Sequence, residues 1–409
     1  MVIKNVSGKL IWLLIVNLVL SIVSLSTYTW GRYIFFLVAI ATGLIYTILF
    51  DGKFRVKFDI FQIILIIFAV YAGVSSLWAM NASDSFSKMV TILSIVFCFY
   101  PIYAYYRDYG DVEQLISGIK WGETFVCIYT IIFVGLNSLI IAASSDRYRI
   151  ANDFANANTL GLCASTVIYL QTWQLMFSKG KKWELICCLP ALIVMGASQS
   201  RKSIVFLLAA VFILYFLRYG EEKKPFKTLF IFISAVAIAI GLFYIASNLE
   251  IFSGLFERMS GLINSLTGAG KVDHSTELRH AMRNLGIEWW LKRPLFGVGI
   301  GNPHILTQQY LGTDAYLHNN FVEILCGGGL IGFILFYSMH VYSILKIIKL
   351  RHIDKSLFAL AISWCILMLI MDYGMVSYYS KLDLFYLMTV FLIIEQMKYK
   401  QNNEMMEIV

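Results

Sequence analysis

Long apolar runs separated by short polar segments dominate this chain of 409 residues. A helix that crosses a hydrocarbon layer of about 30 Å needs roughly 17 to 25 mostly apolar residues. The pattern therefore predicts an all-α polytopic membrane protein with about 12 transmembrane helices, forming a single integral membrane domain over residues 1–409. The expected spans lie near residues 9–25, 33–50, 59–79, 89–105, 121–142, 159–177, 183–198, 202–218, 227–247, 319–346, 357–377 and 381–397.

One long polar segment, residues 248–317, separates the ninth and tenth expected spans. Apolar residues recur at helical spacing between Phe252 and Leu266, and again between Thr276 and Lys292. We therefore expect this loop to carry two amphipathic helices at the membrane surface. The second helix would place Arg279 and Arg283 one turn apart.

Composition agrees with this pattern, because 59% hydrophobic residues, 14% charged residues and a mean hydropathy of +0.72 exclude a soluble domain. The net charge of +8 does not indicate nucleic-acid binding, since the basic residues are dispersed at helix ends. All seven cysteines fall inside expected spans and show no metal-ligand spacing. We therefore expect neither a disulfide framework, nor a bound metal, nor a cofactor.

The distribution of lysine and arginine predicts the orientation of the chain in the membrane. Most of these residues, outside the long loop, lie on one side when loops are assigned alternately, and that side is cytoplasmic by the positive-inside rule. Both termini should then be cytoplasmic, and the long loop should face the exterior or periplasm. The first apolar run has no small-residue cleavage pattern after it, so we expect a helix rather than a signal peptide.

Several arginines are expected on the outer side, where an arginine near lipid usually meets an anion. Arg201 lies in the short hairpin Ser198 to Ser203, which should hold its guanidinium close to the mouth of the helix bundle. The alternative is that this side chain reaches lipid headgroups. The expected outer arginines are Arg147, Arg149, Arg201, Arg279 and Arg283.

His318, Asn319 and Glu323 mark the point where the long loop enters the next span. A neutral imidazole at this point can take a proton from a hydroxyl group, and a helix N-terminus favours a nearby anion. A plain capping role for His318 is the alternative. Glu323 lies within an apolar helix and should have a partner, with Asp372 and the outer arginines as candidates. A purely structural role for Glu323 is the alternative there.

Two glycine clusters flank this point. The run from Gly297 to Gly301 is not a dinucleotide-binding fingerprint, because no strand and helix surround it. It should instead allow a tight turn after Pro294, while Gly327 to Gly329 should allow close helix packing or a kink.

Together these motifs resemble the O-antigen ligase/polymerase superfamily of bacterial polysaccharide assembly. The resemblance covers roughly residues 145 to 335, and the layout of twelve helices with one long outer loop is similar as well. Its motifs are Arg149 with Asn156-Ala157-Asn158, Ser200-Arg201, Arg279, Pro294-x-x-Gly297-x-Gly299, Leu317-His318-Asn319 with Glu323, and Gly329-Leu330-x-Gly332.

The resemblance implies an inverting, metal-independent glycosyltransferase that uses glycans linked to undecaprenyl pyrophosphate at the outer face of the bacterial cytoplasmic membrane. By position, Arg201 and Arg279 would bind the donor pyrophosphate, and His318 would act as base on the acceptor hydroxyl. Arg283 stands where relatives often have an aromatic residue, so either Arg279 or Arg283 is the operative cation. The implied substrate-binding residues are Arg149, Asn158, Arg283, Asn319 and Glu323.

Within the superfamily we favour a polymerase of O-antigen or capsule repeat units, because the segment 301–317 is short and leaves little surface for a large acceptor. The acceptor would be a second lipid-linked repeat unit, and a chain-length regulator is a candidate partner. The alternatives are an O-antigen ligase that uses lipid A core and an enzyme that glycosylates a protein. From other classes, a flippase fits less well because the polar residues gather at helix mouths, and a scaffold would not need the arginines.

Overall fold

The computed structural model describes residues 2–25, 29–49, 56–144, 155–178, 180–220 and 274–407. These ranges are helical and contain no strand, so the all-α prediction is confirmed for them. The helices are α1 (Val2–Val23), α2 (Thr29–Leu49), α3 (Ile60–Val74), η1 (Ser75–Leu77), α4 (Ala82–Asp108), α5 (Val112–Val134), α6 (Leu136–Ser144), α7 (Ala157–Phe177), η2 (Lys182–Cys187), α8 (Cys188–Ser198), α9 (Arg201–Tyr219), α12 (His274–Lys292), α13 (Pro303–Leu311), α14 (Asn320–Lys349), α15 (Lys355–Asp372) and α16 (Lys381–Glu407).

Six of these helices are long and apolar enough to cross a membrane, and the apolar parts of α1 and α2 are shorter. The polytopic prediction agrees with this, while the number of twelve spans stays a prediction. The expected span 121–142 is divided between α5 and α6, because Gly135 has a φ of +81° and ends α5. The expected span 227–247 and the first amphipathic helix lie outside the described residues.

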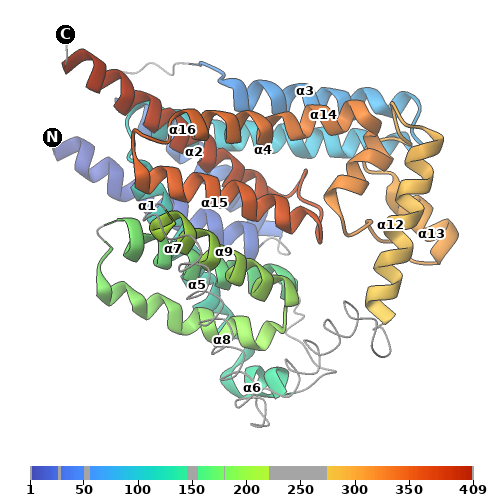
Figure 1. Cartoon of the computed structure of the whole chain (residues 1–409), viewed down its shortest axis with the longest axis horizontal. Helices are drawn as coiled ribbons and strands as arrows, with labels where there is room; N and C mark the ends of the chain where they lie inside the picture. Colours follow the sequence, from blue (N-terminus) through green and yellow to red (C-terminus); the bar gives the residue numbers. More distant parts are fainter. Residues whose placement is uncertain are drawn as a thin grey trace. The chain divides into compact units, whose positions relative to one another are not determined.

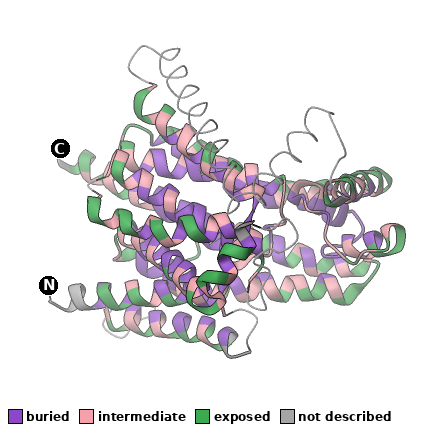
Figure 2. Cartoon of the chain, turned by 90° about the horizontal axis from the view of Figure 1, so that it is seen from below, coloured by how far each residue is buried: buried purple, intermediate pink, exposed green. Residues whose placement is uncertain are grey.

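The chain is organised in two compact units, each built from segments far apart in the sequence. Unit 1 comprises Met1–Val38, Asp111–Lys271 and Arg351–Leu367, and unit 2 comprises Ala39–Gly110, Val272–Leu350 and Met368–Val409. The prediction of one integral membrane domain is not tested by this division. In both units the helices bury one side and expose the other (Figure 2).

In unit 1, α5 packs against α1 and α7. Two glycines one turn apart allow the close approach of α1: a Cβ on Gly118 would come within 2.9 Å of Ile15, and one on Gly122 within 2.8 Å of Val19. Small residues spaced by four are a usual means of packing helices tightly in membranes. This pair therefore fixes the contact between the two helices.

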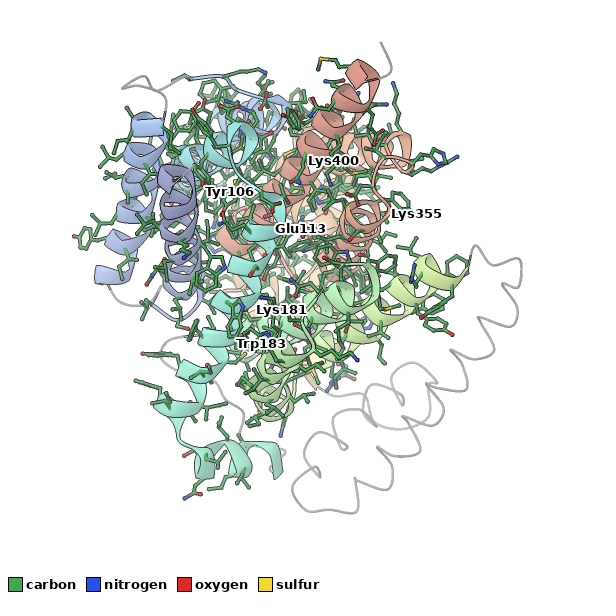
Figure 3. All side chains as sticks on the ribbon, turned by 90° about the vertical axis from the view of Figure 1, so that its left-hand side faces the viewer. Tyr106, Glu113, Lys181, Trp183, Lys355 and Lys400 are labelled. Atoms are coloured by element: carbon green, nitrogen blue, oxygen red, sulfur yellow. The ribbon has the colours of Figure 1, made fainter. Side chains whose placement is uncertain are left out.

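A buried lysine ties α5 to α7 and η2. Lys120 is 0% exposed and donates from Nζ to Gln171 Oε1 at 2.8 Å and to Glu184 Oε2 at 2.5 Å. A buried ammonium group is costly unless it is paired in this way. Lys181, directly before η2, and Trp183 within η2 lie side by side in this unit (Figure 3).

In unit 2, α3 contacts α4 and α14, and α16 also contacts both of these helices (Figure 1). Aromatic pairs fill the spaces between these helices, among them Phe68 with Phe336 and Phe99 with Phe385, with ring centroids 5.3 Å apart in each pair. α12 and α13 pack on the N-terminal part of α14. This packing brings the loop before α14 against the helix itself.

Helix α14 is broken at Gly329, whose φ of 61° and ψ of −165° are not helical. The break leaves backbone groups of α14 without their normal partners four residues away. The loop after α12 replaces them: Val298 N donates to Cys326 O at 2.9 Å and Gly299 N donates to Gly327 O at 2.8 Å. The predicted kink is confirmed.

Amides of α14 also donate hydrogen bonds to carbonyl groups of the loop. Leu330 N, on the far side of the break, donates to Pro294 O at 2.8 Å, and Ile331 N donates to Leu295 O at 3.3 Å. The loop thus supplies partners for two carbonyls before the break and two amides after it, and the carbonyl of Gly328 accepts from Tyr71 Oη of α3, as a buried backbone requires. We call residues 294–301 the inserted loop.

Glycine is required where the inserted loop meets the helix. Gly297 has a φ of +66°, and a Cβ there would lie 2.5 Å from the carbonyl oxygens of Cys326 and Gly327. A Cβ on Gly329 would collide with the backbone of Leu295. The predicted tight turn after Pro294 is therefore confirmed, and its glycines also allow the backbone contact.

We expect Gly329→Ala to destabilise unit 2. An L-residue rarely adopts this φ and ψ, which costs about 1 to 3 kcal/mol before the collision with Leu295 is counted. Thermal unfolding of the purified protein in detergent should show a lower Tm than wild type. Gly196→Ala in α8 is the matched control, because nothing lies within 4 Å of a Cβ there, and its Tm should be unchanged or higher. An unchanged Tm for Gly329→Ala would contradict the broken helix.

Candidate functional site

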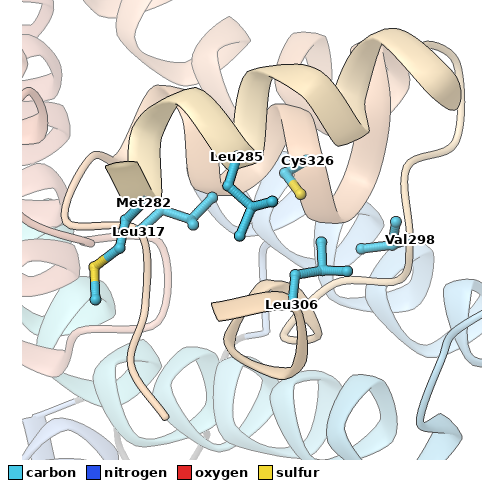
Figure 4. Packing of buried hydrophobic residues seen from close by; sticks show 6 residues of the cluster. All are labelled: Met282, Leu285, Val298, Leu306, Leu317 and Cys326. Carbon is cyan, nitrogen blue, oxygen red and sulfur yellow. The ribbon is translucent and has the colours of Figure 1, made fainter. Parts of the chain in front are cut away.

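An apolar cluster fixes α12 and α13 against the N-terminal part of α14 (Figure 4). It joins Met282 and Leu285 of α12 to Leu317 and Cys326, and its other members are Val298 and Leu306. Burial of such side chains stabilises by about 1.5 to 3 kcal/mol each. The cluster therefore holds α12, with its arginines, close to the residues that begin α14.

The turn between α3 and α4 holds the inserted loop from the other side. Ser75 Oγ accepts from Ile300 N at 3.1 Å, and Ser85 Oγ accepts from Asn302 Nδ2 at 3.0 Å. Asn302 Oδ1 in turn accepts from Asn81 N at 2.6 Å. These buried polar groups satisfy one another, so the loop has a fixed position between α4 and α14.

His318 lies just before α14 in an unusual backbone conformation. Its φ is +55°, one of two positive values among the non-glycine residues of the described ranges. Such a value is strained for a residue with a side chain and persists only where neighbours enforce it. On one side, Leu317 N donates to Glu323 Oε2 at 2.8 Å; on the other, Asn319 Oδ1 accepts from Val322 N at 3.0 Å.

Two expectations are corrected by these contacts. The residue that caps α14 is Asn319 and not His318, because the side-chain oxygen of Asn319 accepts the orphan amide in the first turn. Within the described residues, Glu323 accepts from the backbone amide of Leu317 and not from an arginine, and Asp372 belongs to another network. Lys88 and His304 act electrostatically on Glu323. Substrate-binding roles for Asn319 and Glu323 stay predictions.

Asp372 belongs to a separate buried network that also supports the start of α14. Its carboxylate accepts from Tyr337 Oη at 2.8 Å and Ser377 Oγ at 2.6 Å. Asn320 Nδ2 donates to the same carboxylate at 3.2 Å, and its Oδ1 accepts from Ser377 N at 3.0 Å. Asn320 was not among the predicted site residues, although it follows Asn319 directly in the sequence.

The two arginines of α12 have different surroundings. Arg283 donates to Tyr373 Oη at 2.5 Å, lies 2.6 Å from His280 Nδ1, and has its guanidinium carbon 5.1 Å from the centre of the Tyr373 ring. Arg279 instead acts electrostatically on the phenol of Tyr316, where it partly offsets the rise in pKa that burial causes. Which of the two is the operative cation stays a prediction.

Tyr316 links Arg279 to His318. The ring centroids of Tyr316 and His318 are 4.3 Å apart. Unit 2 thus brings together Arg279, Tyr316 and His318, two of which the sequence predicted as catalytic. Tyr316 was missed, because nothing in the sequence distinguishes it from the other aromatic residues near helix ends.

Arg201 and Asn158 belong to unit 1. Arg201 is the first residue of α9, directly after the N-cap Ser200, and Gln199 in the left-handed conformation closes the hairpin. This confirms the expected tight turn. Ser200 Oγ donates to Asn158 Oδ1 at 3.1 Å, so the hairpin and the start of α7 are joined. Arg149 lies outside the described residues.

A group of polar residues on α4 and α13 escaped the sequence analysis. His304 lies between two carboxylates, with Nδ1 at 2.7 Å from Asp314 Oδ1 and Nε2 at 3.1 Å from Asp84 Oδ2. Lys88 lies one turn after Asp84 in α4 and has its Nζ 3.6 Å from the centre of the Tyr379 ring. A lysine in an otherwise apolar span is a signal that could have identified it.

No group of three possible metal-ligating residues occurs in the part of the chain that the structure describes. The expectation that the reaction needs no metal is not tested by this and stays a prediction. Among the described residues of unit 2, Arg279 acts electrostatically on Tyr316, which lies against His318.

The fold and the site together define a helical membrane protein in which cationic and imidazole side chains gather where a loop re-enters a broken helix. Residues 186–337 match a family model described as O-antigen ligase. This range contains Arg201, Arg279, Arg283, His318, Asn319 and Glu323, but not Arg149 or Asn158.

The chain is also similar to the exopolysaccharide production protein ExoQ of Rhizobium meliloti (strain 1021), with 25% identity over 288 residues. The matched segment is 66% of this chain and 61% of that relative. The two matches agree with the motifs, and the resemblance to the O-antigen ligase/polymerase superfamily is confirmed.

The contacts of His304 with Asp84 and Asp314 should make the stability of the folded protein depend on pH. Burial by itself lowers the pKa of His304, but its hydrogen bonds to Asp314 and Asp84 outweigh burial and raise the pKa above the usual 6.5. The charged imidazole therefore stabilises the folded state below about pH 6.5, and this contribution is lost as pH rises through the higher folded pKa. Glu323 and His304 also interact electrostatically.

We expect the Tm of His304→Gln to fall furthest below that of wild type near pH 5.5, with the difference shrinking toward pH 8.5. Thermal unfolding in detergent across this range tests the prediction. His352→Gln is the matched control, because His352 is exposed and far along the chain from the bridge. A difference between His304→Gln and wild type that does not change with pH would mean that the bridge is not charged.

Proposed function

We propose that this chain is a membrane glycosyltransferase that polymerises oligosaccharide repeat units linked to undecaprenyl pyrophosphate. The observation that carries the proposal is the grouping of Arg279, Tyr316 and His318, with the backbone of His318 held by Glu323 and Asn319. A base held in a strained but fixed conformation, beside a guanidinium, suits transfer from a pyrophosphate leaving group. The reaction belongs to polysaccharide biosynthesis, in agreement with the superfamily.

The proposed step is an inverting displacement. The His318 imidazole takes the proton of an acceptor hydroxyl while that oxygen attacks the anomeric carbon of the donor sugar. The bond from this carbon to the pyrophosphate oxygen breaks, and its electron pair leaves with undecaprenyl pyrophosphate. Negative charge grows on the leaving group, and the guanidinium group of Arg279 offsets it without a metal ion. The same role for Arg201 rests on the resemblance alone.

The roles of the remaining predicted residues follow the same scheme. Arg283 is engaged by Tyr373 and His280, which supports a role in placing α12 more than direct contact with the donor. Asn319 and Glu323 position His318 through the backbone. Arg149 and Asn158 remain proposed contacts of the donor.

A repeat-unit polymerase is favoured over a ligase. Residues 301–317 form the nine-residue helix α13 and a short connection, which leaves little surface for a large lipid A core acceptor. The relative named for exopolysaccharide production also supports polymer synthesis. The ligase reaction is the second candidate, because the matching family model is described by that activity.

We place the enzyme in the bacterial cytoplasmic membrane with both termini in the cytoplasm and the site on the outer face. Support comes from the distribution of lysine and arginine among the expected loops. The substrates would be a lipid-linked donor and a lipid-linked acceptor, and a chain-length regulator is a proposed partner.

Reconstitution of the purified protein tests this function directly. Lipid-linked repeat units, extracted from cells that lack this protein, are supplied alone in EDTA-containing buffer, and the products are separated by chain length. We expect a ladder from wild type and none from His318→Ala, while the control His352→Ala, at an exposed histidine, retains the ladder.

Three other results would change the conclusion. Transfer that appears only when lipid A core is added would replace the polymerase with a ligase. A ladder that EDTA abolishes and Mg²⁺ restores would overturn the metal-free mechanism, and a full ladder from His318→Ala would remove that residue from the reaction.

The arginines should differ in the same assay. We expect Arg279→Ala and Arg201→Ala to lower the initial rate roughly 100-fold or more, as loss of a donor to a developing charge does. Arg283→Ala should lower it less than about tenfold, since Arg283 is bonded to Tyr373. All three variants are first checked for membrane insertion and for a wild-type Tm. Equal losses in Arg279→Ala and Arg283→Ala would contradict the distinction between them.

A further inference from the structure

Three polar side chains that the proposed reaction does not use lie together in unit 2: Lys88 of α4, Tyr316 before α14, and Tyr379 between α15 and α16. The ammonium of Lys88 lies 3.6 Å from the centre of the Tyr379 ring. Tyr316 and Glu323 both act electrostatically on the Tyr379 phenol. Because Tyr316 also lies against His318, the group is continuous with the proposed base.

The fold holds Lys88 in this place. Gly301, with a φ of +85°, lies against its stem, and a Cβ on that glycine would come within 2.8 Å of Lys88 Cγ. Gly301 belongs to the inserted loop, so the loop that satisfies the broken helix also shapes the surroundings of Lys88. The carboxylates of Glu323 and Asp84 attract the ammonium group electrostatically and partly offset the cost of its burial.

The tips of these side chains are available for a ligand. All three residues are partly exposed. Within the described ranges, neither the Lys88 ammonium nor the phenols of Tyr316 and Tyr379 form a hydrogen bond to another protein group, although each can form several. Burial raises the pKa of both phenols, which therefore stay neutral and can both donate and accept.

This chemistry suits a sugar ring. Tyrosine rings offer apolar faces with polar tips, and an ammonium group with free donors can bond to hydroxyl oxygens. The location next to His318 indicates that the sugar belongs to the acceptor and not to the donor. The base must contact the acceptor hydroxyl, whereas Arg279 would contact the donor pyrophosphate.

We propose that Lys88, Tyr316 and Tyr379 form a subsite for the terminal sugar of the acceptor glycan, which binds hydroxyl groups beside the one that reacts at His318. The transfer reaction in this inference rests on the proposed function. The binding of the sugar to the three side chains does not depend on it. Lys88 and the two tyrosines thereby help to select the acceptor.

The test uses a probe that can act only as an acceptor. Mild acid releases the repeat-unit oligosaccharide from its lipid, and without a pyrophosphate it cannot serve as donor. Initial rates of transfer from the lipid-linked repeat unit to this oligosaccharide are measured with each substrate varied in turn. The variants are Lys88→Met, Tyr316→Phe and Tyr379→Phe, which remove a polar tip and keep most of the side chain.

We expect Lys88→Met to raise the acceptor KM roughly tenfold or more, since the lost hydrogen bond has a charged donor. Each tyrosine variant should raise it by a smaller factor, and the donor KM should not change. Lys88→Arg, which keeps the charge, should recover part of the loss. The matched control is Lys292→Met, because Lys292 also lies over an aromatic ring, 4.7 Å from the centre of Trp289, but is bonded to Glu288.

An unchanged acceptor KM in all three variants would overturn the subsite, and so would an equal rise in the donor KM. Binding of the fluorescently labelled oligosaccharide to the purified protein is measured separately. If wild type bound the probe but transferred nothing, the proposed function would fail while weaker binding by Lys88→Met still supported the subsite. If wild type transferred sugar and all variants bound the probe equally, only the subsite would fail.

Discussion

The exchange of backbone hydrogen bonds between the inserted loop and the broken helix α14 is the interaction on which the rest of unit 2 depends. A helix break within an apolar span leaves amides and carbonyls that lipid cannot satisfy. Here Val298 and Gly299 donate to the carbonyls before the break, and the amides of Leu330 and Ile331 after it donate back to the loop. The break in α14 and the position of the inserted loop therefore depend on each other.

This constraint explains how the site is held. The loop continues into Asn302 and α13, which the turn between α3 and α4 holds through Ser85 and Asn81. The apolar cluster then fixes α12 on the same helix, which brings Arg279 near Tyr316 and His318. The left-handed conformation of His318 is enforced from both sides, by Glu323 and by Asn319. A site held in this way has little reorganisation left to do when substrate binds.

Much of this could be predicted from the sequence, because apolar periodicity, glycine clusters and an imidazole before a span are local signals. The turn after Pro294 and the kink near Gly329 followed from glycine alone. The pairing between them did not, since it depends on the register of two segments about thirty residues apart. Lys88 was missed for a similar reason: its significance arises only when folding places it over Tyr379. The predicted partner of Glu323 was wrong for a different reason. Nearly every residue has a backbone amide, so the sequence does not indicate which amide a buried carboxylate will accept from.

The most direct test of the account is an experimental structure of the protein in a lipid nanodisc with a non-hydrolysable analogue of the lipid-pyrophosphate donor. The account predicts that α14 is broken at Gly329 with the inserted loop bonded across the break. It also predicts that the pyrophosphate contacts Arg279, with the anomeric carbon facing His318. A continuous α14, or a pyrophosphate bound away from Arg279 and His318, would contradict it.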